Sequence, residues 1–285
     1  MTHAARTFAA TFLAFAALAT PAHAADTGEG HFRMGDTRST FTHAAAVRVE
    51  RRPDPADDHV YVYLSDRPLD AAVLAADFDP DDAASEAHGD RSGAFVRLCI
   101  TADGDECGLF YRQFAPGDSF NTSGYGTFAL STHDDARIAG HWTLAKPEEF
   151  FGKSYDFDLR FDVAIATSPG QPLPEGGGDA GAAYRAYAAA IARGDLDALR
   201  ASMGEDARWR LPADDPAQAR ETLKSMRDGQ PVDPEIVRGR RNGDTVVLWV
   251  QGRDRDELLP GGRVRMTRHG KAWEVLEQDL GDVGE

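Results

Sequence analysis

Cysteine is scarce in this sequence, because its 285 residues include only Cys99 and Cys107. The pair has no C-x-x-C spacing and no adjacent histidine, which argues against a redox motif or a metal site built on these thiols. Strand-like segments flank residues 102–106, whose composition is typical of a turn. In an oxidising compartment, this pattern predicts a hairpin disulfide between directly opposite cysteines. We expect the bridge to stabilise the fold by about 2–3 kcal/mol.

Long apolar runs are also missing after residue 24, so no later stretch reaches the roughly 20 residues that a membrane-spanning helix needs. The early run over 8–19 is only about a dozen residues long and follows Arg6. It leads to Ala22-His-Ala24, the small-residue pattern that signal peptidase requires. We therefore expect a signal peptide over 1–24, cleaved after Ala24. The mature protein would then be periplasmic or secreted, with no stable membrane insertion.

Basic residues are also few in comparison with acidic ones, since the sequence has 31 Lys and Arg and 47 Asp and Glu. The signal segment contributes Arg6 and no acid, so the mature chain has 30 cations against 47 acids and a formal charge of −17. A charge of this sign repels nucleic acid and anionic lipid headgroups. We therefore exclude nucleic-acid partners.

Catalytic motifs are absent as well: the sequence contains no G-x-S-x-G, no Walker A run and no H-E-x-x-H. The acidic stretch 54–90 could hold calcium, but an EF-hand register from Asp77 places His88 where the final glutamate belongs. We interpret this stretch as a solvated acidic loop. His133 and His141 do not have the close spacing of a zinc site. We predict no catalytic residue, no metal ligand and no cofactor.

The chain is divided by a Pro- and Gly-rich run at 168–178, which we interpret as a linker between two domains. The first segment, 32–167, predicts a mainly β domain, either a sandwich or a small barrel, with one short helix at 69–76. Its strands are predicted where apolar and polar residues alternate, at 46–50, 60–64, 95–100, 109–114 and 155–165.

The second segment, 179–282, has helical spacing first and strand patterns afterwards. Tyr184 and Tyr187 share one face of a helix that ends at a glycine, and further helices follow. Turn signals at 242–244 and 268–271 connect predicted strands. Helices followed by an antiparallel meander indicate an α+β domain.

Three stretches of this segment, 183–199, 207–209 and 270–276, resemble the NTF2-like superfamily, which includes SnoaL-like and ketosteroid-isomerase-like proteins. A long first helix ending in Gly-Asp-Leu, then strands closing on a Trp-containing one, is typical of that family. The resemblance implies a curved sheet wrapped on the helices to form a cone with an apolar pocket. The candidates for lining this pocket are all aromatic: Tyr184, Tyr187, Trp209, Trp249 and Trp273.

The resemblance does not bring an activity with it, because the acids and tyrosine of the isomerase-type members cannot be matched residue by residue. We expect a non-catalytic exported protein that binds a small apolar molecule or an envelope protein. The alternative is an NTF2-like isomerase or hydrolase acting in the C-terminal cone, which requires an acid with a raised pKa deep in the pocket. A third hypothesis is carbohydrate binding by the first domain through Trp142, Tyr125 or Phe120.

Overall fold

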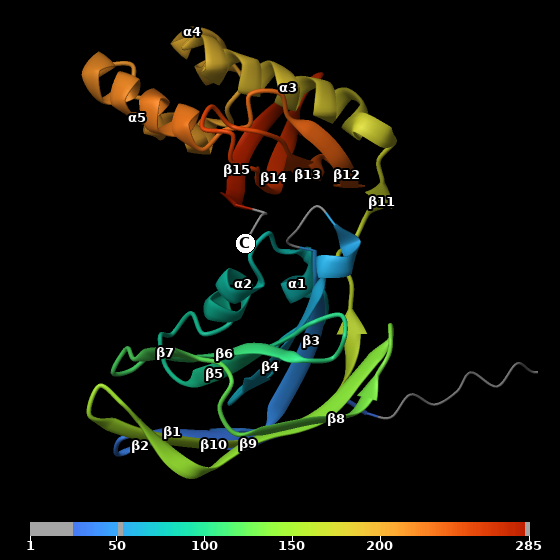
Figure 1. Cartoon of the computed structure of the whole chain (residues 1–285), viewed down its shortest axis with the longest axis vertical. Helices are drawn as coiled ribbons and strands as arrows, with labels where there is room; N and C mark the ends of the chain where they lie inside the picture. Colours follow the sequence, from blue (N-terminus) through green and yellow to red (C-terminus); the bar gives the residue numbers. More distant parts are fainter. Residues whose placement is uncertain (1–24, 51–53, 283–285) are drawn as a thin grey trace, which may run out of the picture.

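The computed structural model describes residues 25–50 and 54–282, which form two units stacked along the long axis of the molecule (Figure 1). The expected signal peptide, 1–24, lies outside the described residues. The first unit contains a ten-stranded mixed sheet, and the second contains a five-stranded antiparallel sheet with helices packed against it. The mainly β prediction is therefore confirmed. No helix within the described ranges is long and apolar enough to cross a membrane.

The first unit consists mostly of strands. Within the described residues they are β1 (Thr27–Met34), β2 (Thr37–Phe41), β3 (His43–Val49), β4 (His59–Ser65), β5 (Ala94–Ile100), β6 (Glu106–Gln113), β7 (Ser119–Thr122), β8 (Thr127–His133), β9 (Arg137–Phe150) and β10 (Lys153–Ala166). Its helical elements are short: η1 (Pro55–Asp57), α1 (Ala71–Ala76) and α2 (Pro80–Glu86).

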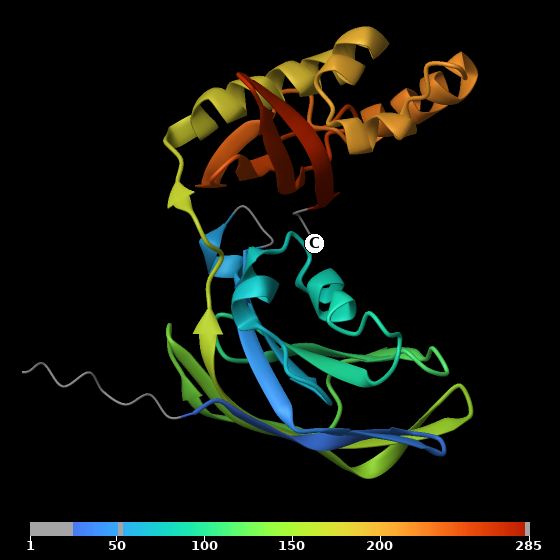
Figure 2. The same cartoon turned by 180° about the vertical axis from the view of Figure 1, so that it is seen from behind.

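The ten strands lie in two layers, with β1, β2, β8, β9 and β10 in one and β3 to β7 in the other (Figure 2). Strand β10 connects them, because its body pairs with β1 and β9 while Ile165 and Ala166 pair with β3. Its alternating pattern buries one face against the other layer. An aromatic group that includes Phe32, Trp142 and Phe157 fills the space between the layers.

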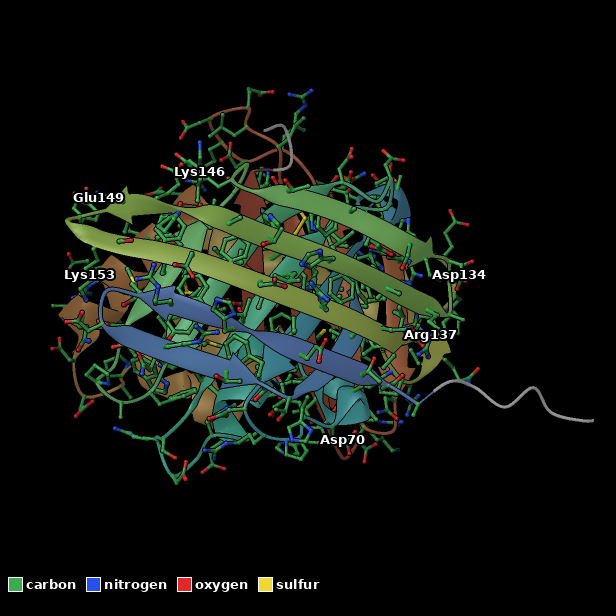
Figure 3. All side chains as sticks on the ribbon, turned by 90° about the horizontal axis from the view of Figure 1, so that it is seen from below. Asp70, Asp134, Arg137, Lys146, Glu149 and Lys153 are labelled. Atoms are coloured by element: carbon green, nitrogen blue, oxygen red, sulfur yellow. A yellow bond between two sulfur atoms is a disulfide. The ribbon has the colours of Figure 1, made fainter. Side chains whose placement is uncertain are left out.

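The outward surface of the first layer is lined with charged side chains. Asp134 and Arg137 lie at one end of this layer, and Lys146, Glu149 and Lys153 lie at the other (Figure 3). The last six residues of β9 are exposed. This surface therefore faces solvent, and the second unit contacts the opposite side of the first unit.

Helices α1 and α2 cover the outer face of the second layer, in the stretch that we predicted to be a solvated acidic loop. The prediction of a loop was wrong, because the stretch contains α2 as well as β4 and α1, which match the strand expected at 60–64 and the helix expected at 69–76, and because several of its acids have structural partners. Asp70 and Asp79 are N-caps whose carboxylates accept backbone N–H bonds from the first turns of the two helices. Asp81 forms an ion pair with Arg97 and accepts a 2.7 Å hydrogen bond from the buried Tyr63 hydroxyl.

The second unit begins with β11 (Gln171–Pro172), a short edge strand within the predicted linker. An edge position tolerates Pro172, since proline has no N–H for a further partner. The remaining elements are η2 (Glu175–Gly177), α3 (Gly178–Arg193), α4 (Leu196–Ala201), η3 (Glu205–Arg210), α5 (Pro216–Asp228), β12 (Glu235–Asn242), β13 (Thr245–Gln251), β14 (Pro260–His269) and β15 (Ala272–Asp282).

Helix α3 ends as its sequence indicates, at Gly194, whose φ of 75° is left-handed and favours glycine. Asp195 then caps α4 through a 3.0 Å bond from the Ala198 backbone N–H. The helices cover one face of the sheet ordered β11-β12-β13-β14-β15, and the first unit lies toward its other face (Figures 1 and 2). The hydrogen bonds that Arg238, Arg240 and Trp249 make to the first unit come from the face of this sheet that the helices leave open.

Candidate functional site at the seam between the units

The five-stranded sheet has two chemically opposite faces, because side chains alternate along each strand. On β13, Val246, Leu248 and Val250 pack into the core shared with the helices. Val247 and Trp249 lie on the other face, toward the first unit. We call the interface between this second face and the first unit the seam.

Arginines flank these two residues in the cross-strand register. Trp249 pairs with Arg238 on β12 and with Arg263 on β14, and Val247 pairs with Arg240 and Arg265 in the next row. Four guanidinium groups therefore project from one face of a single sheet. Each of these four arginines has a carboxylate partner: Asp58 for Arg238, Glu50 for Arg240, Asp279 for Arg263 and Glu277 for Arg265.

Two of these arginines hold the first unit through buried carboxylates. Arg238 donates two hydrogen bonds to Asp58, at 2.7 and 3.2 Å, and stacks over the Trp249 ring at 4.6 Å. Arg240 donates to the Glu50 carboxylate at 2.9 Å, and the Trp249 indole N–H donates to the Glu50 backbone carbonyl. Charge-assisted bidentate pairs of this kind fix orientation as well as contributing free energy.

The other two arginines line a cavity of about 240 Å³, which we call the arginine cavity. The guanidinium groups of Arg263 and Arg265 stack on the Phe78 ring, at 4.5 and 5.3 Å from its centroid. The apolar walls come from both units and include Phe78, Ala75, Pro80, Val247 and Trp249. The charged lining consists of Arg48, Arg240, Arg263, Arg265, Glu50 and Asp77.

Buried donors in this cavity are left without acceptors. The Nε atoms of Arg240 and Arg265 are buried and have no hydrogen-bond partner among the described residues. A buried N–H without a partner costs about 1–3 kcal/mol, so such groups indicate an acceptor that the described residues do not supply.

A second opening along the seam, with a volume of about 610 Å³, surrounds the disulfide. We call it the disulfide cleft, and its lining includes His59, Cys99, Cys107, Asp57 and Asp279. The predicted bridge between the two cysteines is present. The predicted register is corrected, because Cys99 pairs with Gly108 and Ile100 pairs with Glu106. Cys107 is thus the extra residue of a β-bulge, and its Cα still lies only 5.0 Å from that of Cys99.

The two tyrosines predicted to line a pocket lie on the opposite face of the sheet from the seam. Tyr184 and Tyr187 are 0% and 2% exposed and belong to the core between α3 and the sheet. Gln230 donates to the Tyr184 hydroxyl at 2.8 Å, that hydroxyl donates to Gln278 at 3.2 Å, and Gln278 donates to Tyr187 at 3.1 Å. Burial raises the pKa of both tyrosines well above its ordinary value. These phenols therefore stay protonated and hydrogen-bonded at neutral pH.

The three tryptophans are not brought together. Trp249, 3% exposed, is in the seam, while Trp209, 71% exposed, lies on η3. Trp273, 6% exposed, packs into the second unit's core, and Arg241 and Arg268 lie over its ring at 5.4 and 5.9 Å. The Trp273 indole beside Asp179 holds the pKa of that carboxyl below its ordinary value. Of the five predicted pocket residues, only Trp249 lines either seam opening.

The aromatic residues of the carbohydrate hypothesis are mostly inaccessible. Trp142 is 1% exposed and donates its indole N–H to the Tyr125 carbonyl, and Phe120 is 3% exposed. That part of the hypothesis was wrong, because both rings fill the core between the two layers. Tyr125 alone is exposed.

A cluster of Ser65, His88 and Asp66 does not have the geometry for nucleophilic catalysis. The Ser65 hydroxyl and the Asp66 carboxylate both lie 3.3 Å from His88 Nε2, while Nδ1 bonds to the Ala84 carbonyl at 2.8 Å. A catalytic relay needs the acid and the nucleophile on different ring nitrogens. Ser65 and His88 are also fully buried, so the cluster anchors α2 to β4.

Comparison of the chain with protein-family models, with curated proteins and with solved structures finds no match.

Proposed function

We propose that this protein is an exported, non-catalytic binding protein whose ligand is a small organic acid with an apolar body, held in the arginine cavity. The observation that carries the proposal is that arginine side chains and an aromatic wall line one cavity, and that two of these arginines, Arg240 and Arg265, have a buried N–H without a partner among the described residues. A carboxylate satisfies the guanidinium groups of Arg240 and Arg265, and the body of the ligand packs against Phe78 and Trp249.

The size of the cavity restricts the ligand. Pockets for drug-sized molecules enclose roughly 300–1,000 Å³, and the arginine cavity encloses about 240 Å³. A monocyclic acid of the size of benzoate is therefore a suitable probe. Both units contribute walls, so the ligand would also join them.

We further propose that the second unit is an NTF2-like domain whose cone is filled instead of hollow. The order of helices before an antiparallel meander supports the family, and the chain of hydrogen bonds through Tyr184 and Gln278 supports the filled interior. The isomerase or hydrolase alternative requires a carboxylate that faces a void. The groups bonded to the two tyrosine hydroxyls are the amides of Gln230 and Gln278, which do not act as general acids or bases.

The binding proposal is tested by isothermal titration of the purified mature protein with benzoate, and with benzyl alcohol as its uncharged match. We expect benzoate to bind and benzyl alcohol to bind much more weakly. Arg265→Gln removes a charged hydrogen bond worth about 1.5–3 kcal/mol, so benzoate affinity should fall by about 10- to 100-fold.

The matched control is Arg160→Gln, which removes an exposed arginine that pairs with Asp158 in the first unit. Its affinity for benzoate should equal that of the wild type. Failure of the wild type to bind benzoate, or equal binding by Arg265→Gln, would reject the arginine cavity as the site. Export is tested separately by mass spectrometry of the mature protein, whose first residue should be Ala25.

A further inference from the structure

His59 and the two cysteines form a compact group that sequence spacing alone does not reveal, since His59 precedes Cys99 by 40 positions. Its Nδ1 atom lies 3.5 Å from Cys99 Sγ and 4.0 Å from Cys107 Sγ. The three potential ligand atoms all lie within 4.8 Å of one another. Cys99 is buried, His59 and Cys107 are half-buried, and all three line the disulfide cleft.

These distances match the edges of a tetrahedral metal site. With Zn–S of about 2.3 Å and Zn–N of about 2.0–2.1 Å, the sulfur and nitrogen ligands lie about 3.6 Å apart. The nitrogen–sulfur distances in the protein, 3.5 and 4.0 Å, bracket that value. Only the sulfur–sulfur separation differs, because the sulfurs are bonded to each other. Once that bond is broken, rotation of the side chains can separate the sulfurs to the roughly 3.8 Å of a tetrahedral site.

We propose that reduction of the Cys99–Cys107 disulfide opens a three-ligand site for a thiophilic d¹⁰ cation such as Zn²⁺. A dithiol reductant transfers two electrons and two protons to the disulfide and itself becomes a disulfide. Binding of the divalent cation then releases the two thiol protons, which leaves two thiolates and the neutral imidazole of His59 as ligands. The fourth position is taken by water, as in three-ligand zinc sites.

The surroundings favour a cation. The negative charges of two thiolates neutralise a divalent cation, and soft sulfur ligands select zinc over calcium or magnesium. Asp57 and Asp279 also line the disulfide cleft, and the chain as a whole has a formal charge of −16. Arg97 lines the cleft as well, and Asp279 pairs with Arg263, so the charge that holds the cation comes from the two thiolates. Cys107, the extra residue of the bulge, also lines the opening.

The test uses mature protein reduced with dithiothreitol, which is then removed anaerobically by desalting. Cadmium is titrated as a spectroscopic probe for zinc, and thiolate-to-cadmium charge transfer is followed in the ultraviolet. We expect one equivalent to bind to the reduced protein and none to the oxidised protein. His59→Ala should weaken cadmium binding by about tenfold or more. Loss of a residue that only hydrogen-bonds a metal ligand already lowers metal affinity by about 10- to 100-fold, and loss of the ligand itself should lower it at least as much.

The control His141→Ala removes a histidine that pairs with Asp158 on the other layer, and it should bind cadmium as the wild type does. Absence of charge transfer in the reduced protein, or equal affinity of His59→Ala, would overturn the proposal. Far-ultraviolet circular dichroism of the reduced protein accompanies the titration. A reduced protein that has lost its β signal and does not regain it with cadmium would overturn the proposal too.

Discussion

The two faces of the five-stranded sheet differ in the way they satisfy their polar groups. On the helix face, the hydroxyls of Tyr184 and Tyr187 are bonded to Gln230 and Gln278, while the Trp273 indole N–H of the same core has no partner among the described residues. On the seam face, Arg240 and Arg265 retain buried N–H groups that no described residue accepts. A satisfied polar cluster stabilises a fold, whereas an unsatisfied one at a cavity indicates a ligand.

The aromatic residues on the two sides of the sheet also have different roles. Tyr184 and Tyr187 contribute to stability from the interior of the second unit, while Trp249 and Phe78 form walls of the arginine cavity. The sheet is the same, and the side-chain alternation alone assigns each residue to one role. Substitutions on one face should therefore change stability, and substitutions on the other should change binding.

The largest effect is expected from Tyr184→Ala, which removes a fully buried ring from the core. Loss of a buried aromatic side chain costs about 3–5 kcal/mol. Tyr184→Phe keeps the ring and leaves Gln230 and Gln278 with unpaired groups, so it should cost about 1–3 kcal/mol. Urea unfolding at neutral pH measures both. If Tyr184→Phe kept full stability and abolished benzoate binding, the assignment of the two faces would be reversed.

The contribution of the seam to coupling the two units is tested by Asp58→Ala, which removes the carboxylate that Arg238 binds with two hydrogen bonds. Both side chains are largely buried, and we expect a loss of about 2 kcal/mol, below the 3–5 kcal/mol of a fully buried pair. Calorimetry should resolve two unfolding transitions, because the units are then less tightly coupled. The matched control is Asp135→Ala at the exposed Arg48 pair, which should change stability by less than about 1 kcal/mol. A single unchanged transition in Asp58→Ala would show that the seam does not couple the units.

Alkaline pH should destabilise the helix face, and also the first unit, where burial raises the pKa of Tyr63 and Tyr111. Burial raises the pKa of Tyr184 and Tyr187 above the value of about 10 in the unfolded chain. Below pH 10 both states keep these protons, and above it the unfolded state loses them first, so stability falls as pH rises. We expect about 1 kcal/mol per tyrosine at pH 11. Urea unfolding at pH 9, 10 and 11 should show a smaller loss for Tyr187→Phe than for the wild type, and equal losses would argue against this coupling.

The smallest effect is expected at an exposed carboxylate outside both faces. The Ser92 hydroxyl and backbone N–H, with Arg67, lower the pKa of Asp90 to about 2. Its contribution to stability is therefore present above the ordinary pKa and is lost as pH falls toward 2. Carboxyl titration by NMR should find this low pKa, and Ser92→Ala should raise it toward about 3.9. An unshifted pKa in the wild type would contradict the hydrogen bonds at this site.

Much of the second unit could be predicted from sequence, because its signals are local. Gly194 ends α3, Asp195 caps α4, and the turns at 242–244 and 268–271 connect strands with strong alternation. In the first unit, β8 and β9 carry weak signals. No residue of β8 is buried, and β9 ends in six exposed residues. Apolar and polar residues therefore do not alternate clearly along these strands, and the strand pattern is weak.

The candidate site was hidden for a different reason. Arg238 and Arg263 are far apart in sequence, and only the pairing of β12, β13 and β14 places them on either side of Trp249. Phe78 approaches from another unit altogether. The alternation of Arg238, Arg240, Arg263 and Arg265 on predicted strands was the available signal. A row of arginines on the open face of a sheet in an acidic chain indicates a surface that must be covered or filled.

We propose that the ligand lies on the seam face of the five-stranded sheet. The most direct test of this proposal is NMR chemical-shift mapping of the mature protein during titration with benzoate. We predict that the largest perturbations occur at the Trp249 indole N–H, at Phe78 and at Arg265. Perturbations centred on Tyr184, Tyr187 and Gln278 would instead place the ligand between the helices and the sheet, and would contradict the account.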